Sequence, residues 1–190
     1  MLKEEIRKIY LQKRLSLSES EYAQLNFQIY QIFFSAVDLS RIHTLHTFLP
    51  LAKNREPDTW MIIDRIRREF PHIRISVPRV NESTLTLDNY YFEGLHQLEQ
   101  NKWGIPEPRQ GIPTDPEKID LVLVPLLMFD DQGHRVGYGK GFYDKFLTTC
   151  RPDCQRIGIS FFPPVERIEG INVFDMPLHG CVTPATYYSF

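Results

Sequence analysis

The sequence predicts an α/β fold: a single three-layer, Rossmann-like α/β/α domain with a mostly parallel sheet. Segments with the short apolar pattern of strands alternate along the chain with segments of helical periodicity. The segment from Ile119 to Phe129 is almost entirely apolar, which is typical of a strand buried on both faces of a parallel sheet. A length of 190 residues without internal repeats fits one domain, residues 1–190.

The first forty residues are predicted to form two helices. Apolar residues recur at helical spacing from Leu2 to Ile9 and give the first segment one apolar stripe. Ser18 followed by Glu21 has the form of a capping box, which would begin the second helix. We expect that helix to end near Ala36.

Strands and a third helix are expected to alternate over the next fifty residues. The segments Ile42–Phe48 and Ile73–Val77 have strand patterns, and Pro78 is expected to end the second of them. Between them, a helix capped by Asp58 or Thr59 would run to about residue 70. Residues 85–92 alternate only weakly between apolar and polar types.

The C-terminal half begins with a proline-rich segment, residues 105–118, which we expect to be a long surface loop within the domain. The buried strand 119–129 follows. A glycine-rich loop at residues 133–141 is expected to lead into a helix that ends near Cys150. Residues 156–161 are expected to form another strand, and the end of the chain, from Cys181 to Tyr188, is rich in strand-forming residues.

Composition excludes several classes of protein. The 22 Lys and Arg residues nearly balance the 24 Asp and Glu residues, which gives no overall field for nucleic acid or an anionic membrane. The longest uncharged apolar run has nine residues, and the N-terminal segment lacks the apolar stretch of a secretory signal. Three cysteines form no disulfide framework, and Cys150 and Cys154 lack the second pair that a zinc site needs. We therefore expect a cytoplasmic protein. Its expected state is a monomer or a small homo-oligomer.

The glycine-rich loop is the segment with the clearest chemistry. Glycines at alternate positions let backbone N–H groups surround an anion, and Arg135 and Lys140 add positive charge. Asp144 falls in the first turn of the following helix, where a carboxylate could hold a magnesium ion that bridges phosphates. The spacing matches neither a Walker A motif nor the G-x-G-x-x-G dinucleotide fingerprint. The loop therefore predicts phosphate binding of another type, through Gly133, Gly137, Gly139 and Gly141.

The loop sequence R-x-G-x-G-x-G-F-Y-D, residues 135–144, preceded by F-D-x-x-G at residues 129–133, resembles that of the 5-formyltetrahydrofolate cyclo-ligase family. Further short segments follow in the order that the family has. They are Lys3-x-x-x-Arg7, Glu56-x-Asp58-Thr59, Trp103-Gly-Ile-Pro-Glu-Pro108 and Asp175-x-Pro177 with Val182-Thr183-Pro184.

The resemblance implies an ATP- and Mg²⁺-dependent ligase that converts 5-formyltetrahydrofolate into 5,10-methenyltetrahydrofolate with release of ADP and phosphate. It implies catalytic roles for Arg135 and Lys140, and a magnesium site at Asp144 and Asp175. The ATP-binding residues that it implies are Lys3, Arg7, Arg135, Gly137, Gly139, Lys140, Gly141, Tyr143 and Asp144. The folate-binding residues that it implies are Leu49, Glu56, Trp103, Tyr138 and Phe142.

Other interpretations of these residues stay open. From the sequence alone, Lys3 and Arg7 fit a solvated helix face, and we assign Arg14 to that face. Leu49 and Trp103 fit a hydrophobic core as well as a ligand contact. A non-catalytic folate or adenine-nucleotide binding protein is the alternative function, and an enzyme acting on sugar phosphates or coenzyme A esters is a third.

Three departures from the family pattern bear on that choice. Pro164 stands where the family often has glutamine, and His179 stands where it often has a second aspartate. Phe142 replaces a frequent tyrosine, which removes a hydroxyl but keeps a ring that can stack. His43 and His46 are an odd number of positions apart on a strand and should point to opposite faces, which argues against a shared metal.

Overall fold

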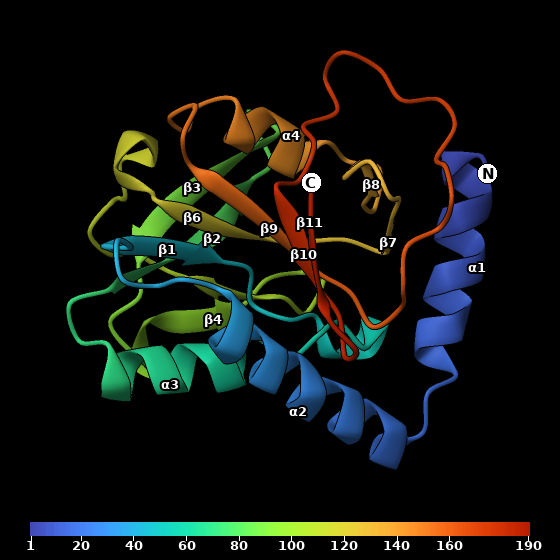
Figure 1. Ribbon diagram of the computed structural model, residues 1–190. Helices are drawn as coiled ribbons and strands as arrows, with labels where there is room; N and C mark the ends of the chain where they lie inside the picture. Colours follow the sequence, from blue (N-terminus) through green and yellow to red (C-terminus); the bar gives the residue numbers. More distant parts are fainter.

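The computed structural model describes all residues 1–190, and the first three of its four α-helices agree with the sequence pattern (Figure 1). Ser18 and Glu21 form the predicted capping box: the Glu21 N–H donates to Ser18 Oγ, and the Ser18 N–H donates to Glu21 Oε2. The helix that follows the glycine-rich loop is shorter than predicted. The helices are α1 (Lys3–Leu15), α2 (Glu19–Ala36), α3 (Trp60–Glu69) and α4 (Phe142–Leu147).

Seven strands form one mixed sheet in the order β11-β10-β9-β6-β1-β2-β3. The five central strands, from β10 to β2, pair in parallel, whereas β11 and β3 add antiparallel edges. The α/β class and the mostly parallel sheet are therefore as predicted. The strands are β1 (Thr44–Thr47), β2 (Arg74–Asn81), β3 (Thr86–Tyr91), β6 (Leu121–Pro125), β9 (Gln155–Ile159), β10 (Gly180–Val182) and β11 (Tyr187–Ser189).

Two hydrophobic clusters pack against the two faces of this sheet. Successive residues of β6 point to opposite faces: Leu121 and Leu123 join the cluster under α2 and α3, whereas Val122 and Val124 join the cluster around α4. Figure 1 shows α2 and α3 along one side of the sheet and α4 on the other. Burial on both faces explains why β6 is apolar throughout.

Helix α1 lies at the end of the molecule rather than on the sheet (Figure 1). It packs through Ile6 against a small cluster with Met128, Val136 and Ile168. Met128 and Val136 belong to the two-stranded hairpin of β7 (Met128–Phe129) and β8 (Arg135–Val136), which leads into the glycine-rich loop. The contact therefore holds α1 beside that loop.

Three segments differ from the sequence prediction. Pro78 does not end its strand: β2 continues past it, because beyond Ser76 it pairs only with β3 and no longer with β1. The apolar run 119–129 is two strands, since the chain leaves the sheet after Pro125 and turns into β7. The proline-rich segment is not all loop, because β5 (Pro106–Pro108) pairs with β4 (Leu98–Gln100).

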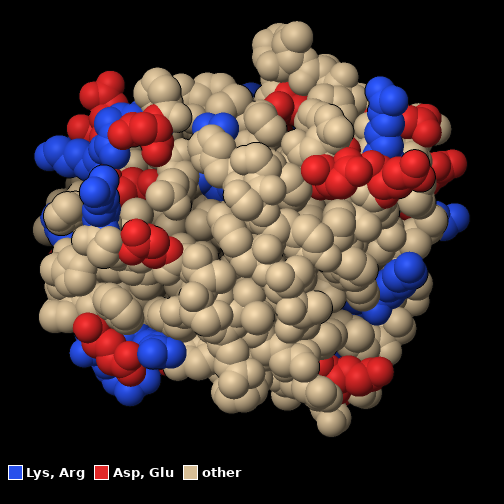
Figure 2. Space-filling model, viewed as in Figure 1, with Lys and Arg blue, Asp and Glu red and all other residues tan.

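Charged side chains of both signs surround the face drawn in Figure 2, whose centre is mostly uncharged. None of the helices has the length and apolar character that a membrane crossing requires.

The burial of β6, the central strand, leads to a first prediction. Leu123 is fully buried in the larger cluster, so Leu123→Ala should lower the free energy of unfolding by about 2–5 kcal/mol through lost burial and a cavity. Urea unfolding would measure the change. Leu95→Ala is the matched control, because Leu95 is 70% exposed and the same truncation there should change stability by less than about 0.5 kcal/mol. Equal losses in both variants would contradict the assignment of the core.

Candidate active site

One cavity of about 810 Å³ lies at the carboxyl ends of β1 and β6, where open α/β sheets bind their ligands. Its walls come from the segment after β1, from β2 and β3, from the glycine-rich loop and from the start of α1. Every ATP-binding, folate-binding, catalytic and metal residue that the family resemblance implied lines this cavity. They are Lys3, Arg7, Leu49, Glu56, Trp103, Arg135, Gly137, Tyr138, Gly139, Lys140, Gly141, Phe142, Tyr143, Asp144 and Asp175.

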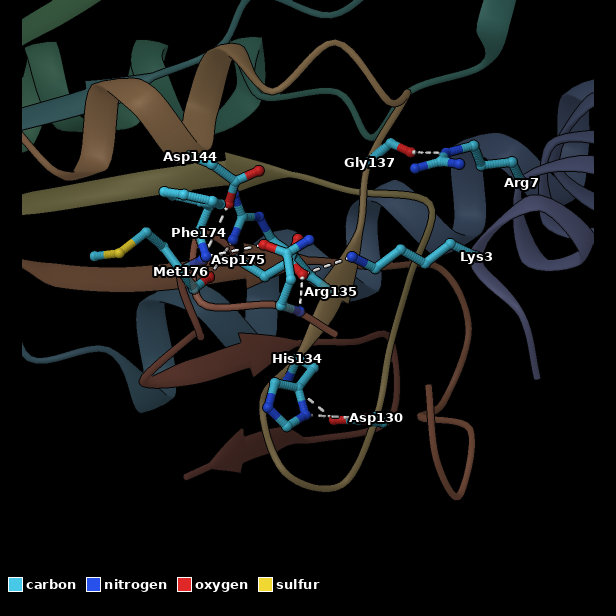
Figure 3. Close-up of polar contacts among 11 residues, drawn as sticks. Lys3, Arg7, Asp130, His134, Arg135, Gly137, Asp144, Phe174, Asp175 and Met176 are labelled. Carbon is cyan, nitrogen blue, oxygen red and sulfur yellow. Dashed lines mark hydrogen bonds and ion pairs between the residues drawn. The ribbon is translucent and has the colours of Figure 1, made fainter. Parts of the chain in front are cut away.

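The glycine-rich loop approaches α1 closely. The Nε–H of Arg7 donates to the carbonyl of Gly137 at 3.0 Å (Figure 3). Gly139 has a φ of +88°, and a Cβ atom placed there would lie 3.3 Å from the guanidinium carbon of Arg7. Gly141 also has positive φ, +71°, at the start of α4. The backbone at Gly139 and Gly141 therefore favours glycine, and Gly139 also makes room for Arg7.

Gly133 does not share this environment. It lies in the turn between β7 and β8, outside the cavity, where an added Cβ would meet the carbonyl of Leu178 at 2.9 Å. The predicted loop 133–141 is thus divided by β8 into a structural turn and a cavity-lining part.

Two ion pairs lie in the cavity wall, and one of them joins residues near the two ends of the chain (Figure 3). Lys3 Nζ lies 2.6 Å from Asp175 Oδ2, and Arg135 Nη2 lies 2.7 Å from Asp144 Oδ1. Arg135 is buried and also donates to the carbonyl of Met176. Burial alone would raise the pKa of Asp175, but hydrogen bonds from Lys3 and the Asn172 N–H outweigh it and hold that pKa below its usual value. Asp175 is therefore held as an anion.

A phosphate-bound Mg²⁺ ion takes one or two protein carboxylates as ligands and fills its other coordination positions with phosphate oxygens and water. The carboxylates of Asp144 and Asp175 match this number and type of ligand. No group of three or more acidic or histidine side chains exists that could cage a metal by itself. Each aspartate binds its protein partners through one oxygen, Asp144 through Oδ1 and Asp175 through Oδ2. The second oxygen of each has no protein hydrogen bond.

Lys140 presents the one exposed ammonium group of the glycine-rich loop. It lines the cavity and forms no ion pair. A free lysine beside the backbone of Gly139 and Gly141 can neutralise an anionic ligand without first breaking a contact.

Glu56 lines the cavity from the segment after β1, is 6% exposed, and lies beside Tyr138 of the glycine-rich loop. Its Oε2 accepts a 2.7 Å hydrogen bond from the N–H of Leu51. Burial raises the pKa of Glu56, while that hydrogen bond, the Tyr138 hydroxyl and the charge of Arg14 oppose the shift. A carboxylate held in this way can accept hydrogen bonds from N–H donors of a ligand.

The remaining predicted residues provide apolar and aromatic surface. Leu49 is 3% exposed; it is part of the hydrophobic core and also forms part of the cavity wall. Trp103 is 38% exposed, with Lys102 Nζ 4.5 Å from its ring centroid. The hydroxyl of Tyr143 is buried without a hydrogen-bond partner. Phe142 lies on the cavity wall beside it.

The prediction for Arg14 is wrong. It does not lie on a solvated face but is 3% exposed, and it donates to Asn54, Leu126 and Tyr138. The sequence did contain an indication that Arg14 lies near the site, because it is two helical turns from Arg7 on the same face of the helix. Further cavity residues were not predicted as site residues from the sequence. They come from β2, β3, the turn between them, and β5, and are Pro78, Val80, Glu82, Leu85, Leu87, Pro106 and Glu107.

The departures from the family pattern at Pro164 and His179 lie outside the cavity lining. Nδ1 of His179 accepts a hydrogen bond from the N–H of Arg156, and Nε2 contacts the guanidinium of the same residue at 2.8 Å. His179 therefore joins neighbouring segments of the fold. His43 precedes β1 and is exposed, whereas His46 lies within β1 and is buried.

Comparison with known proteins identifies a consistent set of relatives. The model of the 5-formyltetrahydrofolate cyclo-ligase family matches residues 1–171. The 5-formyltetrahydrofolate cyclo-ligase of Escherichia coli K12 is 25% identical over 185 residues, which cover 94% of this chain and 98% of that protein. The NMR structure of Aquifex aeolicus 5,10-methenyltetrahydrofolate synthetase is 27% identical, with a TM-score of 0.84 over 100% of this chain and 93% of the other. The Mycoplasma pneumoniae synthetase, at 22% identity and a TM-score of 0.73 over 96% and 98%, shares the fold.

The buried carboxyl of Glu56 leads to a prediction about stability and pH. Because its pKa is raised on folding, the folded state binds this proton more tightly than the unfolded state, and ionisation above about pH 4 opposes folding. Glu56→Gln should therefore gain stability relative to the native protein as the pH rises from about 4 to 7. Thermal unfolding at several pH values would measure this gain.

Glu21→Gln is the control with the opposite sign. Hydrogen bonds from Ser18 lower the pKa of Glu21, so its carboxylate stabilises the fold at neutral pH and loses that effect as the pH falls. This variant should therefore lose stability relative to the native protein as the pH rises. A difference between Glu56→Gln and the native protein that does not vary with pH would show that Glu56 is not shifted as described.

Proposed function

The chain belongs to the 5-formyltetrahydrofolate cyclo-ligase family, and from this premise we propose that it uses ATP and Mg²⁺ to convert 5-formyltetrahydrofolate into 5,10-methenyltetrahydrofolate, ADP and phosphate. Family membership identifies the protein as an enzyme, a cyclo-ligase of folate one-carbon metabolism. In this proposal residues 1–190 act as one cytoplasmic domain, with ATP and the folate as its ligands.

The observation that carries the proposal is a single cavity lined by two chemically different sets of residues, which we call its phosphate side and its folate side. The phosphate side consists of the glycine-rich loop with Lys140 and Arg7, whose positive charge and backbone N–H groups suit phosphates. The folate side consists of the buried acceptor Glu56 with the apolar and aromatic side chains of Leu49 and Trp103, which suit a flat heterocycle with N–H groups. A reaction that joins a nucleotide phosphate to a folate needs both sets in one enclosure.

The chemistry requires activation of the formyl group. The oxygen of the formyl group that N5 carries is a poor leaving group, so N10 cannot close the ring by displacing it from the formyl carbon. In the first step the formyl oxygen forms a bond to the γ-phosphorus of ATP, and the bond from that phosphorus to ADP breaks. In the second step N10 attacks the formyl carbon, the carbon–oxygen bond breaks to release phosphate, and the N10 proton is lost.

The protein residues contribute positioning and charge rather than a covalent nucleophile. Lys140 and Arg7 bind the phosphates at the glycine-rich loop, and Lys3 adds positive charge where α1 begins. Arg135 fixes Asp144 through their ion pair and adds its charge to the same side of the cavity. Glu56 orients the pterin so that its formyl oxygen faces the γ-phosphate.

Asp144 and Asp175 would hold Mg²⁺ through the carboxylate oxygens that have no protein hydrogen bond. When bound, the ion would neutralise charge on the phosphates. Lys3 and Arg135 orient the two aspartates through their ion pairs.

The formation of methenyltetrahydrofolate tests the function directly. Its absorbance should rise when the protein is mixed with 5-formyltetrahydrofolate, ATP and Mg²⁺, and it should not rise when any one of these is left out. Omission of the protein controls for uncatalysed ring closure. Binding of both ligands without formation of this product would favour the non-catalytic binding protein, and binding of phosphate compounds without folate would favour the third alternative.

A pair of variants tests the two sides of the cavity separately. Glu56→Ala should weaken binding of the folate by about tenfold or more, since it leaves ligand donors unpaired, and should leave the nucleotide affinity nearly unchanged. Lys140→Ala should lower kcat on the order of a hundredfold with little effect on folate affinity. Calorimetric titration of each ligand and steady-state kinetics would measure these effects.

Lys118→Ala serves as a control for the loss of one positive charge. Lys118 is exposed, precedes β6 at its amino end and does not line the cavity, so this variant should behave as the native protein does. If Glu56→Ala lost affinity for ATP rather than for the folate, the assignment of the two sides would be wrong.

A further inference from the structure

Arg14 occupies an unusual place for an arginine in a surface helix. It is 3% exposed, although Lys13 and Leu15 beside it on α1 are exposed. It does not line the cavity, but it lies along the helix from Lys3 and Arg7, which do. Burying a guanidinium removes it from water at considerable cost, so its partners must compensate for that loss.

Each nitrogen of the Arg14 guanidinium reaches a different segment of the chain. Nε donates to the carbonyl of Asn54 at 2.8 Å, in the 3₁₀ helix η1 (Ala52–Asn54) that follows Leu51. Nη1 donates to the carbonyl of Leu126 at 3.3 Å, where the chain leaves β6. Nη2 donates to the hydroxyl of Tyr138 in the glycine-rich loop. One side chain therefore joins α1, both loops of the cavity and the end of the central strand.

The charge of Arg14 also acts on Glu56. Its hydrogen-bond partners are two carbonyls and a hydroxyl, so it forms no ion pair of its own. The Tyr138 hydroxyl lies between the two charges, and Arg14 opposes the upward shift that burial gives the pKa of Glu56. The other titratable groups around Glu56 are the buried hydroxyl of Tyr143 from α4 and that of Tyr22 from α2, which donates to the Glu56 carbonyl at 2.6 Å.

We propose that Arg14 is a positioning residue of the folate side, which fixes the loop of Glu56 against Tyr138 of the glycine-rich loop so that the carboxylate faces the pterin. This inference rests on the proposed function for the identity of the ligand that Glu56 meets. Arg14 touches neither ligand: it acts through Glu56, Tyr138 and the backbone of η1. Its loss should therefore affect the folate more than the nucleotide.

The test compares Arg14→Met and Arg14→Lys with Lys8→Met, an exposed position on the same helix that does not line the cavity. Arg14→Met should raise the KM for 5-formyltetrahydrofolate by about tenfold or more, with a change of less than about threefold in the KM for ATP. Arg14→Lys should raise the folate KM as well, because an ammonium cannot reach all three acceptors. Lys8→Met should leave both values as they are in the native protein.

The pH profile separates charge from geometry. Folate binding through the Glu56 carboxylate falls as the pH drops through the pKa of that group. Without the positive charge of Arg14 the pKa of Glu56 rises further, so in Arg14→Met this loss should occur at higher pH. Arg14→Lys keeps the charge and should keep the native profile. Equal rises in both KM values with an unshifted profile in Arg14→Met would overturn the proposal and leave Arg14 a purely structural residue.

Hydrogen exchange in the ligand-free protein makes the result independent of the reaction. The amides of Leu51, Asn54 and Leu127, which donate to Glu56, to the Leu51 carbonyl and to the Val136 carbonyl before the glycine-rich loop, should exchange faster in both Arg14 variants and not in Lys8→Met. Unchanged exchange in these segments would overturn the proposal even if the kinetics changed. If the native protein formed no methenyl product, the proposed function would fail, whereas the exchange result would still decide whether Arg14 positions the two loops.

Discussion

In the parallel pairing of β6 with β1, Leu45 lies opposite Leu121 and Thr47 opposite Leu123, so both strands end at the same edge of the sheet. The loop that carries Leu49 and Glu56 leaves from the end of β1 there. The chain that becomes the β7–β8 hairpin and the glycine-rich loop leaves from the end of β6. The register of two neighbouring strands thus brings the loop of Glu56 beside the glycine-rich loop. A shift of one residue would turn the buried side chains of β6 to the wrong faces, so the hydrophobic core fixes this register.

The charged groups of the cavity are held in place before any ligand binds. Lys3 and Arg135 each bind one of the two aspartates, and Arg7 binds a loop carbonyl. These contacts already restrict the long side chains, so less side-chain conformational entropy is lost when a ligand binds. Lys140 is the contrast, since it is free and exposed. The site therefore combines a preorganised framework with an exposed, unpaired lysine in the glycine-rich loop.

The sequence predicted the helices, the parallel core and the cavity residues that belong to short motifs, because periodicity and glycine spacing are local properties. It did not predict that β2 would continue through Pro78, since this depends on which neighbour the strand has at that point. It also placed Arg14 in solvent, because the acceptors that bury this residue lie 40 to 124 positions away along the chain. The family resemblance, rather than the residue pattern, brought Glu56 and Asp175 into the site.

The attachment of α1 has a consequence for how the protein loses activity. Of its 13 residues only Ile6 and Arg14 are buried, so little apolar surface holds it to the rest of the molecule. Elements with few buried contacts open at a lower free energy than the whole fold. Detachment of this one helix would remove Lys3 and Arg7 from the cavity while the sheet stayed intact. On heating, inactivation should therefore precede global melting, and a nucleotide bound as in the proposed function would delay it by holding the helix to the glycine-rich loop.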